Sequence, residues 1–324
     1  MKAKKQISIM DYVKPYIGLV LLIILFAILT KGQSLTMKNI KIVTEQSLAL
    51  MLTTMGVFFV MTTGMMDLSV SGVVCVCCYV LAKACSVNIP LGLVLTLLTG
   101  VALGLFNGIT TSVLKVPSFL ATLCTAYICT GVMTHFISSS SAIVPFELYV
   151  ADTFAFKVPM VIVLILLVTL VFNFKPFGHF VRLIGSNETG AHYSAIDVTK
   201  VKILCFVING ALAACAAFLI GIRSGTAALS TGSDLMFNTM IALTLGGFPF
   251  GGGAKARISA AVVGSFTTYV LSNGMLLVGM SATTMQLIKG ALFLAIILFT
   301  SPTFKLLIDK VGQKAKKKQS VQAE

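Results

Sequence analysis

Hydrophobic residues gather in long runs along the chain, and short polar stretches separate one run from the next. A run of about 20 mostly apolar residues is long enough to cross a bilayer as a helix. The pattern therefore predicts an all-α integral membrane protein with about ten transmembrane helices. The predicted spans are Pro15–Lys31, Val43–Thr63, Leu68–Ala84, Pro90–Leu114, Phe119–Ser138, Pro159–Phe174, Val201–Ile222, Phe237–Gly247, Ile258–Val278 and Thr283–Thr300.

Two of these runs need comment. The first run is followed by Lys31-Gly32-Gln33, which is no small-residue cleavage site, so we interpret it as an uncleaved helix rather than a secretory signal. The eighth run, Phe237–Gly247, is shorter than the others and ends in glycine.

The basic residues predict the orientation of the spans. With ten spans, the side that holds both termini collects 17 Lys and Arg residues and the other side collects 6, with Lys289 inside a span. Cytoplasmic loops carry the excess of Lys and Arg, so both termini are predicted to be cytoplasmic. The expected organisation is a basic tail at 1–14, a permease domain at 15–301 with a cytoplasmic loop at 175–200, and a basic tail at 302–324.

Composition supports the membrane assignment. Hydrophobic residues make up 57% of the chain and charged residues 10%, with a mean hydropathy of +1.00. Soluble domains carry about 25% charged residues. This composition excludes a soluble enzyme, and the net charge of +14 fits topology signals and anionic membrane lipid better than nucleic acid.

No catalytic constellation is visible in the sequence. His135, His179 and His192 lie on different segments, and Gly251–Lys255 lacks the spacing of an ATP-binding P-loop. The eight Cys residues lie in or at the ends of apolar runs, without the spacing of a metal site. We therefore predict no metal and no cofactor, and any ATP is expected to bind another subunit.

Three ionisable residues lie in or near the predicted spans. Glu45 is either a functional carboxylate or a residue at headgroup level. Asp67 can cap the third span and can also line a solute pathway. Lys289 lies about two turns into the last span and can extend toward the surface, pair with a carboxylate or line the pathway.

Two Gly-rich breaks, Thr62–Gly72 and Gly246–Gly253, interrupt hydrophobic stretches in the two halves of the chain. Paired interruptions of this kind point to the central site of a transporter, although both can also be tight cytoplasmic turns. Free backbone groups and nearby polar side chains can bind a sugar. The predicted substrate-pathway residues are Asp67, Ser69, Asn107, Gly246, Gly247 and Lys289.

The loop at 175–200 carries a helix-start signal. Ser186 or Asn187 can cap a short helix with Glu188 in its first turn, and Asp197 can cap the next helix. A short helix outside the membrane, over Asn187–Ser194, predicts a docking element, whereas the alternative is a plain connector. The residues predicted to couple to a partner are Gly185, Ser186, Asn187, Glu188 and Ser194.

Several short motifs occur in a fixed order between about residues 43 and 300. They are Gly64–Gly72, Gly104–Gly108, Val116–Leu123, Gly185–Glu188, Ser194–Val198, Leu245–Gly247, Gly251–Ile258, Asn273-Gly274 and Lys289. In combination they resemble the ribose-type permeases of bacterial ABC importers, with signatures such as GIDLSVG, Gly-x-x-Asn-Gly and xPxFIATL. Met66 stands where the first signature has Ile, and Ala256 stands where a later one has Gly.

The resemblance implies half of a membrane channel in the bacterial inner membrane. An extracytoplasmic substrate-binding protein delivers a simple sugar, a separate ABC ATPase drives transport from cytoplasmic loops, and a second permease copy or paralogue completes the channel. Nucleosides and autoinducer-2 are alternative solutes in this group. A secondary, ion-coupled carrier is the alternative from another class, and the sparse buried carboxylates argue against it.

Overall fold

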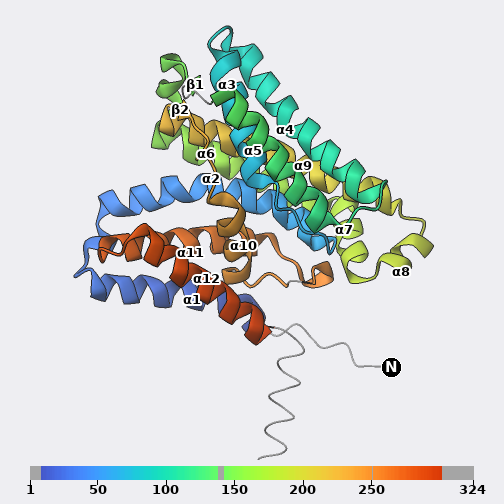
Figure 1. Cartoon of the computed structure of the whole chain (residues 1–324). Helices are drawn as coiled ribbons and strands as arrows, with labels where there is room; N and C mark the ends of the chain where they lie inside the picture. The colour runs from blue at the N-terminus through green and yellow to red at the C-terminus, as the bar shows by residue number, and fades with distance from the viewer. Residues whose placement is uncertain (1–8, 138–141, 250, 301–324) are drawn as a thin grey trace, which may run out of the picture.

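The computed structural model describes residues 9–137, 142–249 and 251–300, and this part of the chain is almost entirely helical (Figure 1). An apolar helix stands at each of the ten predicted runs, which confirms an all-α membrane protein. These helices are α1 (Ile9–Leu29), α2 (Met37–Thr62), α3 (Val70–Cys85), α4 (Ile89–Ser112), α5 (Ser118–Ile137), α6 (Phe154–Phe174), α9 (Val198–Ser224), α10 (Leu235–Leu245), α11 (Ile258–Leu277) and α12 (Ala282–Thr300).

The helices differ in their ability to cross a membrane. Within the described residues, α2, α4, α5, α6, α9 and α11 are long and apolar enough to span, whereas α1, α3, α10 and α12 have shorter apolar stretches. The 11 residues of α10 extend roughly 16 Å, about half of the hydrocarbon core. Six candidate spans are therefore established by length and composition.

Short elements connect these helices. They are η1 (Gln33–Leu35), β1 (Ala142–Ile143), η2 (Phe146–Ala151), α7 (Pro176–Ser186), α8 (Glu188–Tyr193), β2 (Thr226–Ala227) and η3 (Gly253–Lys255). β1 pairs antiparallel with β2, with Ala142 opposite Ala227, and this pairing ties the connection before α6 to the end of α9. The predicted C-terminal basic tail and residues 1–8 of the N-terminal tail lie outside the described residues.

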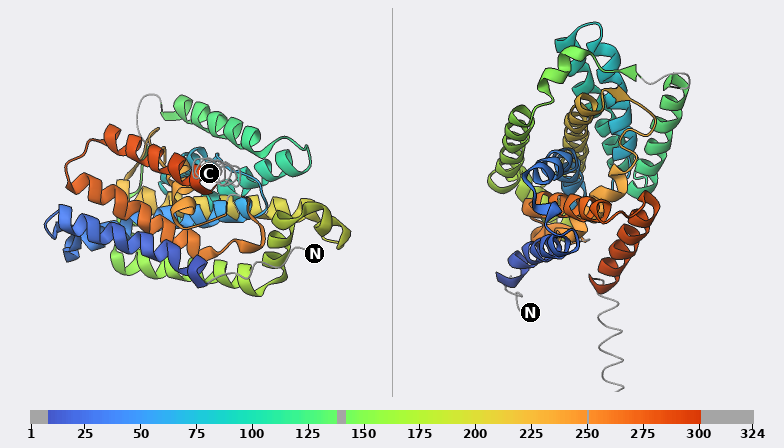
Figure 2. Two further views of the ribbon diagram at one scale, coloured as in Figure 1. Left: turned by 90° about the horizontal axis from the view of Figure 1, so that it is seen from below. Right: turned by 90° about the vertical axis from the view of Figure 1, so that its left-hand side faces the viewer.

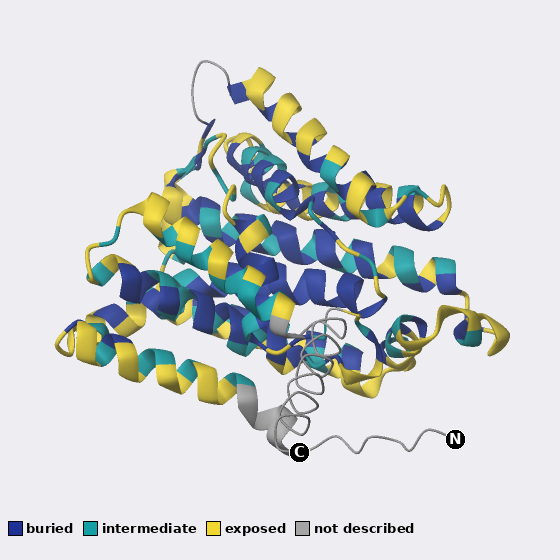
Figure 3. Ribbon diagram, turned by 60° about the horizontal axis from the view of Figure 1, so that its bottom comes forward, coloured by how far each residue is buried: buried dark blue, intermediate teal, exposed yellow. Residues whose placement is uncertain are grey.

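The helices form two groups with α2 between them. One group holds α3, α4, α5 and α9, and the other holds α1, α10, α11 and α12 (Figures 1 and 2). In its most apolar window, 78% of α2 is buried, against 17% of α6, so α2 forms the core and α6 presents its apolar surface outward. Figure 3 shows the same contrast between central and peripheral helices.

Small residues allow α4 and α9 to pack closely. A Cβ at Gly100 or Gly104 of α4 would collide with the backbone of α9 at Gly210 or Phe206. Membrane helices associate through such small residues because they let the two backbones approach. The α4 and α9 helices therefore form a closely packed pair within the first helix group.

The two ends of the bundle carry different structures. At one end, a Cβ at Gly185 of α7 would collide with the Thr62 carbonyl at the end of α2 and would crowd Gly253 of η3. We call this the α7 end. The opposite end carries η1, η2 and the β1–β2 pair, and we call it the β1–β2 end.

Candidate functional site

A buried carboxylate lies between the helices of the first group. After α2 ends, the chain turns at Gly64, where φ is +83°, and folds back toward the bundle. Asp67 Oδ1 accepts hydrogen bonds from the Ser69 N–H at 2.7 Å and the Ser69 hydroxyl at 2.6 Å. Its Oδ2 accepts one from Asn209 Nδ2 at 2.6 Å. Asp67 is only 2% exposed.

The hydrogen bonds continue into α4 and α5. Asn107 Nδ2 donates to Ser69 Oγ at 2.8 Å, and Thr125 Oγ1 donates to Asn107 Oδ1 at 2.6 Å. We call Asp67, Ser69, Asn107, Thr125 and Asn209 the buried polar network. All five are buried, so in this conformation the network faces other parts of the same subunit.

The network lies inside the bundle and not at its surface. Asn209 packs against Gly56, where an added Cβ would collide with the asparagine side chain. Gly56 precedes the end of α2 by six residues, which is about 9 Å along the helix. The first Gly-rich break therefore folds back to this depth.

The predicted cap of the third span needs correction. α3 begins at Val70 with Ser69 in the N-cap position, and no side chain there caps the helix. The Asp67 carboxylate accepts the Ser69 N–H instead, two residues along the chain. This turn, rather than a helix cap, fixes the local path of the backbone.

A cleft of about 500 Å³, with apolar walls and several polar side chains, opens between α10 and α12. Its apolar walls include Phe237, Ile241 and Phe293. Its polar lining residues are Ser233, Asp234, Asn238, Gln286 and Lys289. Lys289 Nζ donates to Asn238 Oδ1 at 3.2 Å, and Asp234 lies within electrostatic range of the same ammonium. We call this hollow the α10–α12 cleft.

The predicted pathway glycines form a bend next to this cleft. A Cβ at Gly246 would collide with the Ala260 carbonyl of α11, and Gly247 has a φ of +76°. Neither residue lines the cleft. The six predicted pathway residues thus fall into three places, namely the buried polar network, the bend after α10, and the α10–α12 cleft with Lys289.

The two Gly-rich breaks meet at the α7 end. A Cβ at Gly252 in the second break would press on the carbonyl oxygens of Met61 and Thr62, where the first break begins. Ser186 Oγ accepts the Ala254 N–H at 2.8 Å, so α7 is joined to the second break as well. One junction therefore connects α7 to both breaks.

The loop at 175–200 contains two helices, and the sequence predicted one. Asn187 caps α8 by accepting the Gly190 N–H at 3.0 Å, whereas Ser186, the alternative cap, belongs to α7. Glu188 pairs with Lys202 at 2.7 Å. Ser194, just after α8, donates to the Gly190 carbonyl at 2.9 Å. Asp197 accepts the Lys200 N–H at 3.0 Å, which confirms its predicted capping of the next helix.

The loop also carries exposed apolar side chains. α7 buries Val181 and Ile184 against the bundle, while Leu183 is 50% exposed. Tyr193 at the end of α8 is 86% exposed. Large exposed apolar residues outside the spans are suited to contact with another protein.

An ion-pair cluster lies at the β1–β2 end. Lys157 of α6 is 3% exposed, and its Nζ lies 2.8 Å from Asp152 Oδ1 and 3.4 Å from Glu45 Oε2. Glu45, which the sequence left open between two roles, therefore belongs to an ion pair.

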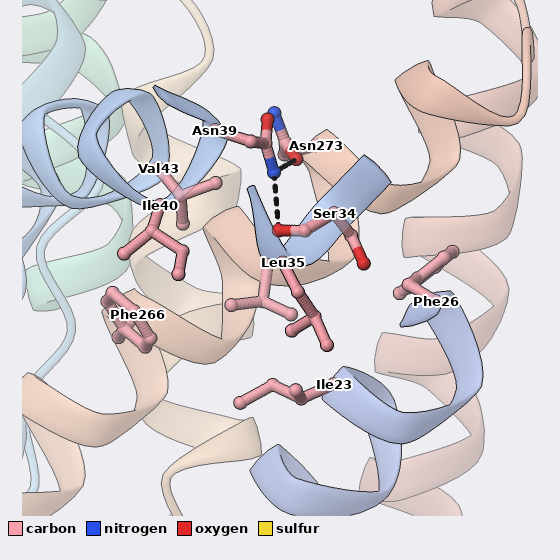
Figure 4. Close-up of a pocket in the computed structure, with 10 residues that line it drawn as sticks. Ile23, Phe26, Ser34, Leu35, Asn39, Ile40, Val43, Phe266 and Asn273 are labelled. Atoms are coloured by element: carbon pink, nitrogen blue, oxygen red, sulfur yellow. Dashed lines mark hydrogen bonds between the residues drawn. The ribbon is translucent and has the colours of Figure 1, made fainter. Parts of the chain in front are cut away.

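A narrower groove of about 180 Å³ runs between α1, η1, α2 and α11 (Figure 4). Most of its walls are apolar, including Ile23 and Phe266. At one edge, Asn39 Nδ2 donates to Asn273 Oδ1 at 2.8 Å and to the Ser34 carbonyl at 2.9 Å. Because a sugar needs several convergent polar groups, this groove suits an apolar chain better than a sugar.

Four functional candidates were missed at the sequence level. Asn209 and Thr125 belong to the buried polar network, and Asn238 and Asp234 line the α10–α12 cleft. A polar residue in the middle of an apolar run, such as Asn209 beside Gly210, is the signal that could have identified the first of them.

Comparison with known proteins places the chain among transport permeases. Residues 39–297 match the family described as "Branched-chain amino acid transport system / permease component". The autoinducer 2 import system permease protein LsrC of Photorhabdus laumondii is 28% identical and covers 87% of each chain. The ribose import permease protein RbsC of Haemophilus influenzae is 26% identical, in an alignment that covers 88% of this chain and 91% of the RbsC chain. No solved structure matches the chain.

Proposed function

The chain belongs to this family of transport-system permease components, and on that premise we propose that it is the membrane-spanning permease of an ATP-binding-cassette importer for a small sugar or sugar-like solute. The observation that carries the proposal is the near full-length similarity to permeases named for autoinducer 2 and ribose import. The family description mentions branched-chain amino acids, but these relatives and the sequence motifs both favour a sugar.

We propose ten spans with both termini in the cytoplasm. The six long helices supply six of them, and the shorter helices α1, α3, α10 and α12 stand at the other four predicted runs, with α10 extending through about half of the hydrocarbon core. The distribution of 17 against 6 basic residues supports this orientation, because Lys and Arg concentrate in cytoplasmic loops. The α7 end is then cytoplasmic and the β1–β2 end is external.

We propose the α10–α12 cleft as this subunit's share of the solute pathway. Polar side chains such as Lys289, Asp234 and Gln286 are costly against lipid, so a second permease chain would cover the cleft and enclose a polar passage. Gly246 and Gly247 would set the angle at which α10 ends beside it. Asp67, Ser69 and Asn107 would contribute by holding the first Gly-rich break, and would reach the solute only if that break moved.

We propose that α7 and α8 receive the ABC ATPase. Gly185 and Ser186 join α7 to both Gly-rich breaks, and Asn187, Glu188 and Ser194 hold α8 in place. Tyr193 and Leu183 supply an exposed apolar contact. A substrate-binding protein would meet the opposite, β1–β2 end.

The test is uptake by a complete importer, reconstituted from this chain with an ABC ATPase and a substrate-binding protein. We expect ATP-dependent uptake of radiolabelled D-ribose or autoinducer-2 that persists when ionophores collapse the ion gradients. Uptake that needs an ion gradient and continues without the ATPase would overturn the proposal and favour the secondary carrier.

A further inference from the structure

A hollow of about 250 Å³ at the β1–β2 end has no role in the account so far. We call it the entry hollow. Residues of α2, α6, α9, α10 and α11 surround it, so it lies within one subunit. Its lining residues are Glu45, Gln46, Ala49, Lys157, Leu219, Ile220, Arg223, Ser224, Leu235 and Tyr269.

The charges at the entry hollow balance. Lys157 and Glu45 of the lining form an ion pair, Asp152 beside the hollow pairs with the same Lys157, and Arg223 adds a second cation to the lining, so two basic groups stand with two carboxylates. An environment without net charge favours a neutral guest over a strongly anionic or cationic one.

Part of the polar lining has no partner within the protein. In the described part of the chain, neither the Gln46 side chain nor the Arg223 guanidinium forms a hydrogen bond or an ion pair. A purely structural ion-pair cluster would need only Lys157 and its two carboxylates. Gln46 and Arg223 thus leave hydrogen-bonding capacity directed at the hollow.

The entry hollow adjoins the α10–α12 cleft. Leu235 lines the hollow and the neighbouring Asp234 lines the cleft. Tyr269 of the hollow lies within electrostatic range of Asp234, which in turn lies within electrostatic range of Lys289. Polar groups therefore lead from the β1–β2 end to the cleft.

We propose that the entry hollow is a binding subsite for a neutral polyhydroxylated solute, which it holds before the solute passes to the α10–α12 cleft. Arg223 and Gln46 supply donors for hydroxyl oxygens, Glu45 supplies an acceptor for hydroxyl hydrogens, and the Tyr269 ring offers an aromatic face. A few convergent polar groups above an apolar floor are the usual make-up of a small-molecule site. This inference rests on the proposed function, because it assigns the external end from the proposed topology.

Two variants of the complete importer test the subsite. Arg223→Gln replaces the charged, unpaired guanidinium with a shorter, neutral amide, and Ala49→Leu fills the buried floor without touching an ion pair. Lys83→Gln is the matched control, since Lys83 is an exposed cation in the last turn of α3, outside the hollow. Uptake rate is measured against the concentration of radiolabelled D-ribose or autoinducer-2, whichever the unmodified importer takes up, at matched membrane abundance.

We expect both variants to raise the half-saturating concentration by about tenfold, as the loss of a hydrogen bond from a charged group does, while the control stays within about twofold. If Arg223→Gln raises the half-saturating concentration and Ala49→Leu does not, Arg223 acts at the protein surface, and the proposal of a subsite in the hollow is wrong. Unchanged kinetics in both variants would equally overturn it. If Ala49→Leu does not accumulate, Gln46→Ala takes its place under the same criteria. Absence of any uptake by the unmodified importer would instead overturn the proposed function.

Discussion

Asp67 and Lys289 are both ionisable residues among apolar helices, yet their surroundings are opposite. Asp67 is 2% exposed, and both carboxylate oxygens accept hydrogen bonds from the same subunit. Lys289 makes one hydrogen bond of 3.2 Å and faces a cleft of about 500 Å³. A polar network whose hydrogen bonds are formed within the protein fixes the structure, whereas polar groups that keep unused donors or acceptors beside a cleft can bind a solute. We therefore assign Asp67 to the framework and Lys289 to the passage.

The largest effect is expected from Asp67→Ala. This change leaves the Ser69 N–H, the Ser69 hydroxyl and the Asn209 amide without their acceptor, at roughly 1–3 kcal/mol for each buried donor. The amount of folded protein in the membrane should fall sharply. Size-exclusion profiles of detergent extracts and thermal melting curves would measure this loss. Normal abundance with lost uptake would contradict the framework role and restore Asp67 to the pathway.

Asp67→Asn is the matched control for this change. Asn209 Oδ1 is buried without a partner, so its amide can flip and accept from an introduced Asn amide. We expect abundance near that of the unmodified chain. A loss as large as that of Asp67→Ala would show that the negative charge itself is needed.

Lys289→Met should abolish most uptake and leave the fold intact. Met keeps the apolar stem and most of the length of the side chain, while the ammonium facing the cleft is lost. We expect uptake to fall at least about tenfold at equal abundance. If Lys289→Met lowers abundance in parallel with uptake, Lys289 belongs to the framework and the contrast with Asp67 is lost.

Tyr193→Ala should have a smaller effect, at the α7 end. Tyr193 is 86% exposed, so its removal costs the subunit little packing but removes the apolar contact that we propose for the ATPase. We expect solute-stimulated ATP hydrolysis by the reconstituted importer to fall several-fold. Tyr127→Ala, at a 72% exposed tyrosine of α5, is the control and should leave hydrolysis unchanged. Equal effects of the two variants would argue against docking at α8.

The smallest effect concerns Asp197, the cap of α9. Hydrogen bonds from the Lys200 backbone and then its side chain hold the pKa of the Asp197 carboxyl below its ordinary value. Its ionised form therefore adds stability at neutral pH, and this contribution is lost as the pH falls through the lowered pKa. Asp197→Asn should melt slightly lower at pH 7, and the difference should shrink on acidification and vanish once the pH lies below the lowered pKa. A difference that grows on acidification would contradict this assignment.

The sequence predicts the helices better than it predicts the site. Long apolar runs determine helices directly, and Asn187 and Asp197 were recognisable caps because capping is local. α7 was not predicted, although proline is tolerated in the first turn of a helix, as at Pro176, and Gly178 fits a close approach to the Phe172 carbonyl.

The site depends on contacts between distant segments. Asp67 and Asn209 are 142 positions apart, and no local pattern pairs them. Ser69 and Asn107 were predicted to be near Asp67, and the structure brings all three together, but their burial inside one subunit follows only from the packing of α3, α4 and α9. The cleft around Lys289 likewise requires knowing that α10 and α12 are neighbours.

The most direct test is thiol accessibility in native membranes, with Gln286→Cys in the cleft and Thr125→Cys in the buried polar network. Gln286 lines the cleft and is exposed, whereas Thr125 is 3% exposed. Cys124 is the exposed native thiol among the described residues, so both variants would carry Cys124→Ser. The account predicts that a small, charged methanethiosulfonate reagent modifies Gln286→Cys rapidly, that the transported solute slows this reaction, and that Thr125→Cys stays unmodified. Comparable modification of Thr125→Cys, with no reaction at Gln286→Cys, would show that the passage runs through the network and would contradict the assignment.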